Sequence, residues 1–184
     1  MTPARKKPAE PESPSEASDA IPPTDDDLYG DKPVEEPTEQ FVVFRLAAEW
    51  YGVPILRVRE VVCLDTITPL PGASAAIIGI ANLRGNIVSV TDLRQVFGLE
   101  SRPRAARNRL VVIDLEAAPT ALLVDEVGGV VAVPRSHLEP PLATLEPSRG
   151  IYIEQTCRWG ERLVAILRLD PLRELTSSPR PIAA

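Results

Sequence analysis

The pattern of apolar and polar residues changes near residue 40. From Phe41 onward, apolar residues gather in short runs, some alternating and some continuous, with Gly, Pro, Asp and Asn between them. Runs of this kind with breaks of this kind are typical of β-strands. Ten such runs occur, at residues 41–47, 50–55, 58–64, 76–81, 87–91, 110–115, 121–124, 127–133, 151–156 and 163–169. The gaps are too short for the helical crossovers of a parallel α/β fold.

Helices are expected in two places only. The first covers residues 92–97 and ends at Gly98, and the second covers residues 170–175, where Pro171 occupies the first helical position. Each helix follows a turn glycine (Gly85 or Gly160) and an apolar strand, so the two halves echo one another, with the polar segment 100–108 between them. The pattern predicts an all-β barrel or sandwich, and the echo favours two five-stranded, SH3-like β-barrels, each followed by a short helix.

The first 40 residues have a different composition. They contain eight of the 20 prolines, 11 acidic and four basic residues, and neither Phe nor Trp. Such a segment has too little apolar surface to offset the entropy of ordering it. We therefore expect a disordered acidic, Pro-rich tail at 1–39, a folded domain at 40–175 and a short disordered tail at 176–184. The folded part has a net charge of only about +1, which disfavours nucleic-acid binding by the arginines between 102 and 109.

The chemistry-bearing residues do not form an enzyme site. His137 is the single histidine, which leaves a zinc site without its usual ligands. Cys63 and Cys157 lie in apolar runs and are expected to be buried thiols in a reducing cytosol. Gly128-Gly129 lacks the lysine of a phosphate-binding loop. We therefore expect a non-catalytic protein without a cofactor or metal. No apolar run is long enough for membrane insertion, so we expect the protein in the cytoplasm.

The most specific motif is Asn82-Leu83-Arg84-Gly85, followed by the strand 87–91 and by Asp92-Leu93-Arg94. Gly85 and Asn86 are expected to form a turn, and Asp92 to be the N-cap of the first helix. The motif places charges at both ends of a strand but supplies no nucleophile and no general base. It therefore indicates recognition of a partner.

With these motifs the chain closely resembles the CheW family of chemotaxis coupling proteins. The resemblance covers about residues 40–175 and departs from the family at Ser89, where proline is common, and at Glu154-Gln155, which replaces a usual glycine. It implies a scaffold between the cytoplasmic tip of methyl-accepting chemoreceptors and the regulatory domain of a CheA-type histidine kinase, recruited to receptor arrays at the inner membrane. The matching motifs are Trp50-Tyr51-Gly52-Val53-Pro54-Ile55, Val58-Arg59-Glu60-Val61, Ile67-Thr68-Pro69-Leu70-Pro71, Ile78-Gly79-Ile80-Ala81-Asn82-Leu83-Arg84-Gly85, Asp92-Leu93-Arg94, Phe97-Gly98-Leu99, Leu122-Leu123-Val124-Asp125-Glu126-Val127 and Arg162-Leu163-Val164-Ala165-Ile166-Leu167.

The resemblance also implies where partners bind. It places the strand with Val58 and Glu60 at the receptor-facing groove, and we expect Arg84 to form a bidentate pair with Glu60. Gly79, lacking a side chain, would let a partner backbone approach closely. Val58, Glu60, Gly79 and Arg84 are thus the predicted contact residues, whereas the kinase surface is not predicted.

Two further expectations complete the prediction. We expect Asp125-Glu126 to lie in a solvated turn. The alternative function is the same adaptor role in a pilus-motility, biofilm or polar-localisation pathway, which other CheW-like domains serve.

Overall fold

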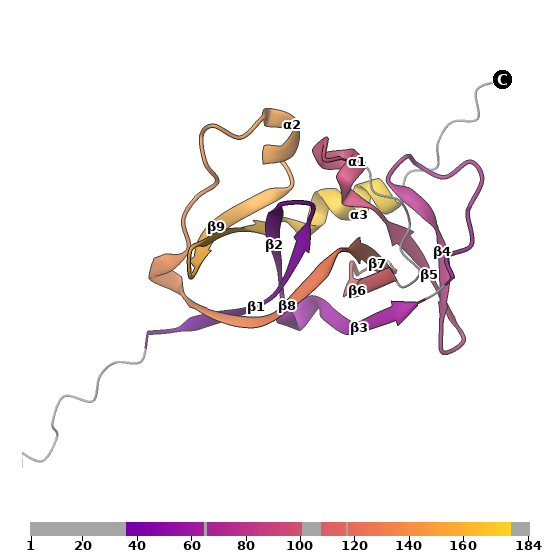
Figure 1. The fold of residues 1–184 in the computed structure, drawn as a ribbon, viewed down its shortest axis with the longest axis horizontal. Helices are drawn as coiled ribbons and strands as arrows, with labels where there is room; N and C mark the ends of the chain where they lie inside the picture. The colour runs from indigo at the N-terminus through magenta and orange to yellow at the C-terminus, as the bar shows by residue number, and fades with distance from the viewer. Residues whose placement is uncertain (1–35, 65, 101–107, 117, 178–184) are drawn as a thin grey trace, which may run out of the picture. The chain divides into compact units, whose positions relative to one another are not determined.

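Ten β-strands make up most of the part of the chain that the computed structural model describes, residues 36–64, 66–100, 108–116 and 118–177 (Figure 1). The predicted all-β class is confirmed. Three α-helices and two short 3₁₀ turns connect the strands. The elements are β1 (Thr38–Leu46), β2 (Glu49–Pro54), η2 (Ile55–Arg57), β3 (Val58–Leu64), β4 (Ile77–Leu83), β5 (Asn86–Thr91), α1 (Leu93–Phe97), β6 (Asn108–Asp114), β7 (Pro119–Val124), β8 (Glu126–Pro134), η3 (Arg135–His137), α2 (Pro147–Gly150), β9 (Ile153–Trp159), β10 (Arg162–Leu167) and α3 (Leu169–Ser177).

The strands form two five-stranded sheets of the same design. Sheet A has the order β8-β1-β2-β10-β9 and sheet B the order β3-β6-β7-β5-β4. Each sheet is antiparallel except for one parallel pair, β2 with β10 in sheet A and β7 with β5 in sheet B. In these strand orders β8 and β9 are the outermost strands of sheet A, and β3 and β4 are those of sheet B.

The two halves of the sequence exchange a hairpin. The first hairpin, β1–β2, lies in sheet A with β8, β9 and β10, whereas β6–β7 lies in sheet B with β3, β4 and β5. The expectation that each half of the sequence forms its own unit is therefore wrong. The segment 100–108 joins α1 to β6 within sheet B and does not connect two separate halves; its residues 101–107 lie outside the described residues.

Tight turns set the register of the hairpins. In the β4–β5 hairpin Leu83 pairs with Asn86, so the turn is Arg84-Gly85 and not the expected Gly85-Asn86. Both central residues have a positive φ, 51° for Arg84 and 92° for Gly85. A type I′ turn requires positive φ at both positions and matches the right-handed twist of the strands. The turn thereby holds the Arg84 side chain at the tip of the hairpin.

Apolar side chains on both faces of the sheets form three clusters. The largest contains residues of both sheets and joins them, with Phe44 and Tyr51 from sheet A and Val111 and Leu122 from sheet B. The Tyr51 ring stacks between Phe44, at 6.3 Å, and Phe97 of α1, at 5.1 Å. The other two clusters each belong to the strands of one sheet and adjoining residues.

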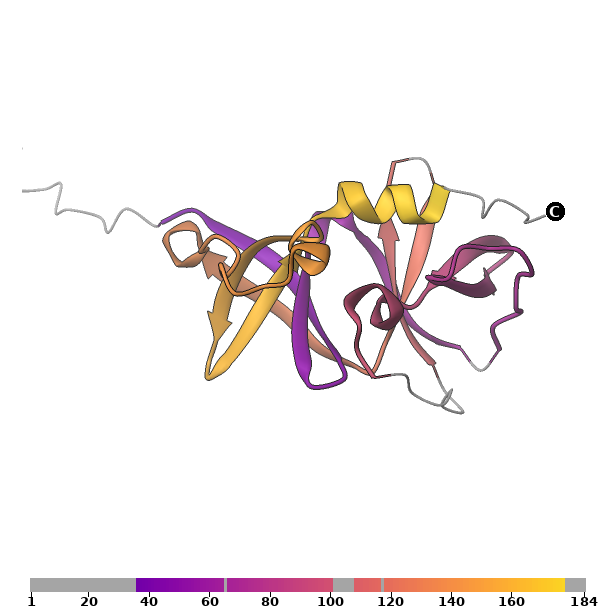
Figure 2. The same ribbon diagram turned by 90° about the horizontal axis from the view of Figure 1, so that it is seen from above.

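Helices α1 and α3 seal the junction between the sheets. Both contribute side chains to the shared cluster, Phe97 from α1 and Leu172 from α3. Helix α3 leaves sheet A after Leu167 and runs toward sheet B (Figure 2). Near its end the Leu175 carbonyl accepts a hydrogen bond of 3.2 Å from Ser74 Oγ in the β3–β4 connection. Helix α2, four residues long with Pro147 at its start, was not predicted.

The two cysteines differ in exposure. Cys157 is buried on β9, and burial raises the pKa of its thiol. Cys63 is exposed, so its predicted burial is wrong. The strand β3 alternates between half-buried and exposed residues because it lies at the edge of sheet B with one face toward solvent. A continuous apolar run does not distinguish such a strand from one buried on both faces.

Candidate partner-binding surfaces

Glu60 and Arg84 come together although they lie on different elements. Glu60 belongs to β3, and Arg84 to the β4–β5 turn at the opposite edge of sheet B. Arg84 Nη2 lies 3.6 Å from Glu60 Oε2, with exposed side-chain fractions of 86% and 31%. This distance is longer than a hydrogen bond, so the expected bidentate geometry is wrong. An exposed contact of this kind contributes about 0–1 kcal/mol to stability, which leaves the guanidinium available to another carboxylate.

Val58 and Gly79 are less accessible than Arg84. Val58 is half-buried and packs against the cluster between the sheets. Gly79 is buried, and a Cβ there would overlap the carbonyl oxygen of Thr68. Thr68 and Ile80 exchange two backbone hydrogen bonds of 2.9 and 2.8 Å. The backbone that approaches Gly79 is therefore the chain's own, and the glycine shapes the edge of sheet B.

Asp92 begins α1. Its Oδ1 accepts hydrogen bonds from the Arg94 backbone nitrogen at 3.0 Å and from Arg94 Nη1 at 3.1 Å. Its backbone is extended, and Gly98 ends the helix with a φ of 62°. An acceptor at this position satisfies one of the free N–H groups of the first turn. The capping hydrogen bond also orients the Arg94 side chain.

Asp125 is buried, with 7% of its surface exposed. It forms an ion pair with Arg94 Nη2, and its Oδ2 accepts a hydrogen bond of 2.7 Å from the Ala47 backbone nitrogen. Its expected place in a solvated turn is therefore wrong, because the β1–β2 turn and α1 cover it. Glu126 is exposed and pairs with Arg45 at 3.1 Å.

Leu56 is the most exposed large apolar side chain in the described part of the chain, at 93%. It lies on η2 and borders a hollow of about 420 Å³. Residues of β1, β2 and η3 form the rest of the hollow, which is lined by Thr38, Glu39, Gln40, Pro54, Ile55, Leu56 and Arg135. A single exposed apolar side chain is common on protein surfaces, so it is the adjoining hollow that makes Leu56 a candidate contact residue. Sequence reasoning missed Leu56; its signal is an apolar residue between Pro54 and Arg57 that interrupts the strand pattern.

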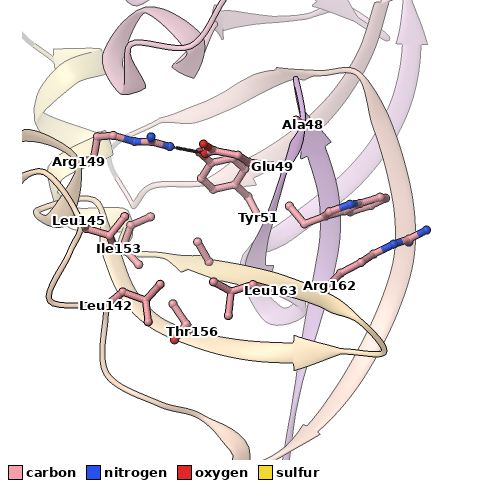
Figure 3. A pocket seen from close by; sticks show the side chains of 12 residues that line it. Ala48, Glu49, Tyr51, Leu142, Leu145, Arg149, Ile153, Thr156, Arg162 and Leu163 are labelled. Atoms are coloured by element: carbon pink, nitrogen blue, oxygen red, sulfur yellow. Dashed lines mark hydrogen bonds and ion pairs between the residues drawn. The ribbon is translucent and has the colours of Figure 1, made fainter.

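A larger hollow, of about 470 Å³, lies beside β2, β9 and β10 and the segment leading to α2 (Figure 3). Leucines 142, 145 and 163 give it apolar walls. At one end Glu49, Tyr51 and Arg149 bind one another: Tyr51 Oη donates to Glu49 at 2.5 Å, and Arg149 Nη2 donates to Tyr51 Oη at 2.9 Å and pairs with Glu49.

This polar cluster is structural. Burial, and then the Glu49 carboxylate, raise the pKa of Tyr51 far above its ordinary value. The hydroxyl therefore stays protonated and cannot act as a nucleophile or a general base. Sequence reasoning also missed this cluster, because Glu49 and Arg149 are 100 positions apart.

The charged and polar side chains of the described residues mostly pair with one another. Within those residues no three side chains of His, Cys, Asp or Glu lie together as a metal site requires. No helix of the described part combines the length and apolar character of a membrane span. Several exposed arginines face carboxylates rather than forming a free basic patch, as in the pairs Arg57–Glu116, Arg59–Asp114 and Arg135–Glu39. This chemistry fits binding to protein partners.

Comparison with known proteins agrees with the geometry. The family model described as "CheW-like domain" matches residues 40–175. The chemotaxis protein CheW of Treponema pallidum is 27% identical over 137 residues, which cover 72% of this chain and 81% of that protein. The protein PilI of Pseudomonas aeruginosa is 33% identical over 108 residues, 56% of this chain and 61% of that protein. The crystal structure of the scaffolding protein TtCheW from Thermoanaerobacter tengcongensis superimposes with a TM-score of 0.64 at 32% identity, over 72% of this chain and 90% of that one.

Proposed function

The chain belongs to the CheW-like domain family, and we propose that it is a non-catalytic adaptor that couples methyl-accepting chemoreceptors to a CheA-type histidine kinase. One observation carries the proposal: a CheW-like domain presents an exposed ion pair on sheet B and an exposed leucine beside sheet A. An adaptor must hold two partners at once, which requires two separate surfaces. We propose that the protein is recruited to receptor arrays on the cytoplasmic side of the inner membrane.

The receptor surface is centred on Arg84 and Glu60. Arg84 is 86% exposed and lies 3.6 Å from Glu60, beyond hydrogen-bond length, so its guanidinium can donate hydrogen bonds to a carboxylate of a receptor helix. Arginine suits this exchange because its planar fork binds carboxylates with two parallel hydrogen bonds. Val58 lies on β3, as Glu60 does, and anchors this strand by packing against the apolar cluster between the sheets. Gly79 keeps the edge of sheet B in shape and contributes to the surface indirectly.

The kinase surface is centred on Leu56. Its side chain is 93% exposed next to a hollow lined by β1, β2 and η3. A kinase regulatory domain that covered this leucine would gain about 1.5–3 kcal/mol from apolar burial. Leu56 borders a hollow lined by residues of β1, β2, η2 and η3, and Arg84 is not among them; with two such surfaces each partner can bind while the other remains bound.

A second candidate function is the same adaptor role in a pilus-motility, biofilm or polar-localisation pathway. The similarity to PilI favours it. A pull-down from the native cytosol with mass spectrometry distinguishes the two candidates by the receptors and the kinase recovered with the protein.

Titration with a receptor fragment and a kinase regulatory domain tests the two surfaces. Arg84→Ala should weaken receptor binding about tenfold or more, because it removes charge-assisted hydrogen bonds, and should leave kinase binding unchanged. Leu56→Asp should do the opposite. Arg158→Ala, an exposed arginine on β9, is the matched control, and circular dichroism checks the fold. Equal loss of both partners in either folded variant would contradict the two-surface proposal.

A further inference from the structure

Asp125 marks the point where the chain crosses from sheet B to sheet A. It follows the end of β7 and precedes the start of β8. Its backbone N–H donates to the Arg45 carbonyl of sheet A at 2.9 Å, and its own carbonyl accepts from Arg109 Nη1 of sheet B at 2.9 Å. Its Oδ2 accepts from the Ala47 backbone nitrogen in the β1–β2 turn at 2.7 Å. One residue thus makes directional contacts with both sheets.

Arg94 adds a charged contact to this crossing. It lies on α1, which follows β5 of sheet B. Its Nη2 pairs with Asp125 and its Nη1 with Asp92, and the side chains of Arg94 and Asp125 are only 3% and 5% exposed. We call Arg94 and Asp125 the joint. Through Asp125, the joint links α1, which follows sheet B, to the β1–β2 turn of sheet A.

The joint is a weak source of stability. Removing two charges from water costs several kcal/mol, which their attraction repays only with complete hydrogen bonding. That bonding is incomplete, because Arg94 Nε is buried and has no hydrogen-bond partner among the described residues. The apolar cluster around the joint holds the sheets together, but apolar contacts are non-directional. The joint supplies the directional contacts that the cluster lacks.

We propose that Arg94 and Asp125 are positioning residues that fix the angle between sheets A and B. The receptor surface around Arg84 belongs to sheet B, whereas the hollow beside Leu56 is built largely from elements of sheet A. A change in the angle therefore moves one surface relative to the other. In this respect the inference rests on the proposed adaptor function: the joint holds the two partners in the arrangement that coupling needs.

Distances within the free protein test the joint without any partner. A spin label on the exposed Cys63 of β3 and a second on Val130→Cys of β8 report the separation of the two sheets, in a background with Cys157→Ala. Arg94→Lys, which keeps the charge but loses the planar fork, should broaden or shift the distance distribution measured by pulsed electron resonance. Arg173→Ala, on the corresponding helix α3, should leave it unchanged. An unchanged distribution in a folded Arg94→Lys protein, or in a folded Asp125→Asn protein where Arg94→Lys does not fold, overturns the proposal.

Receptor-stimulated kinase activity tests the link to coupling. Arg94→Lys should bind each partner separately as the unmodified protein does, yet reduce receptor stimulation of the kinase about tenfold. Full stimulation despite a broadened distance distribution would overturn the link to coupling. Lack of stimulation by the unmodified protein would instead refute the proposed function, and the distance measurement would still decide the joint.

Discussion

Helices α1 and α3 both contain a Leu-Arg pair, yet the two arginines lie in opposite surroundings. Each helix follows a six-residue strand with the same burial pattern, β5 or β10, and each contributes a Leu-Arg pair whose leucine is 1% exposed. Arg94 of α1 pairs with Asp125 in the interior, both side chains 5% exposed or less. Arg173 of α3 lies 3.5 Å from Glu116 on the surface, with exposed fractions of 43% and 64%.

The surroundings of the two acceptors explain the difference. Asp125 is enclosed by the β1–β2 turn and α1. Glu116 lies in the β6–β7 turn, has a φ of 65°, and also faces Arg57 at 3.3 Å. The internal repeat thus preserves the apolar anchor of each helix but not its electrostatics. How deeply an ion pair is buried therefore decides how much stability is lost when one of its partners is removed.

The largest expected effect comes from removing the buried acceptor. Asp125→Ala leaves the Arg94 charge in the interior without its partner and should lower the free energy of unfolding by about 3–5 kcal/mol. Urea unfolding followed by circular dichroism measures this loss, with Glu126→Ala, the exposed neighbouring acid, as the control. A loss below about 1 kcal/mol would mean that the buried and exposed pairs are equivalent.

A double substitution sharpens the comparison. Arg94→Met with Asp125→Leu removes both charges and keeps apolar volume, so it should recover at least half of the stability that Asp125→Ala loses. Recovery stays incomplete because the Ala47 N–H loses its acceptor. The same urea titrations measure it. A double variant as unstable as Asp125→Ala would show that the hydrogen bond to Ala47, rather than the charge pair, dominates.

The local features of this fold were readable from the sequence. Short apolar runs, some alternating and some continuous, located the ten strands, and the cap at Asp92 and the glycine at 98 bounded α1. Both depend on residues close in sequence. The hairpin exchange was not readable, because partners such as Val130 and Val42 are joined only by long-range pairing that leaves no local pattern.

The candidate sites divide in the same way. The Glu60–Arg84 contact was predicted beside the family resemblance, but its distance of 3.6 Å was not, because the two residues come from β3 and the β4–β5 turn, at opposite ends of the strand order of sheet B. Asp125 was expected in solvent because an Asp-Glu pair between two strands normally marks a turn. The enclosing Ala47 and Arg94 are far from it in sequence. The sequence pattern therefore does not show that a residue is buried by segments far from it in the chain.

Removing the exposed acceptor should have a small effect. Glu116→Ala breaks its contacts with Arg57 and Arg173 and should cost about 0–1 kcal/mol of unfolding free energy. The cost should shrink further in high salt, because screening weakens exposed pairs. Parallel urea titrations at low and high salt measure both effects. A salt-independent loss as large as that of Asp125→Ala would contradict the assignment of this pair as exposed and weak.

The smallest expected effect concerns the protonation of Asp114, which forms an exposed cluster with Arg57 and Arg59. Two hydrogen bonds from Arg59, at 3.1 and 2.7 Å, lower the pKa of Asp114 below its ordinary value. Because the pKa of the folded state lies below that of the unfolded state, the interaction stabilises the fold above the unfolded-state pKa and disappears as the pH falls through the folded-state pKa.

Arg59→Ala should therefore raise the pKa of Asp114 toward its ordinary value and remove that acid-sensitive contribution to stability. A carbon-detected NMR titration of the Asp114 carboxyl measures the change directly. Arg57→Ala is the matched control, since Arg57 acts on Asp114 through its charge alone and contributes less than Arg59. A larger pKa change in Arg57→Ala than in Arg59→Ala would show that the summed charge of the cluster, rather than the hydrogen bonds, governs this acid. The exposed region would then differ from the buried joint in kind as well as in strength, because the joint acts through directed contacts.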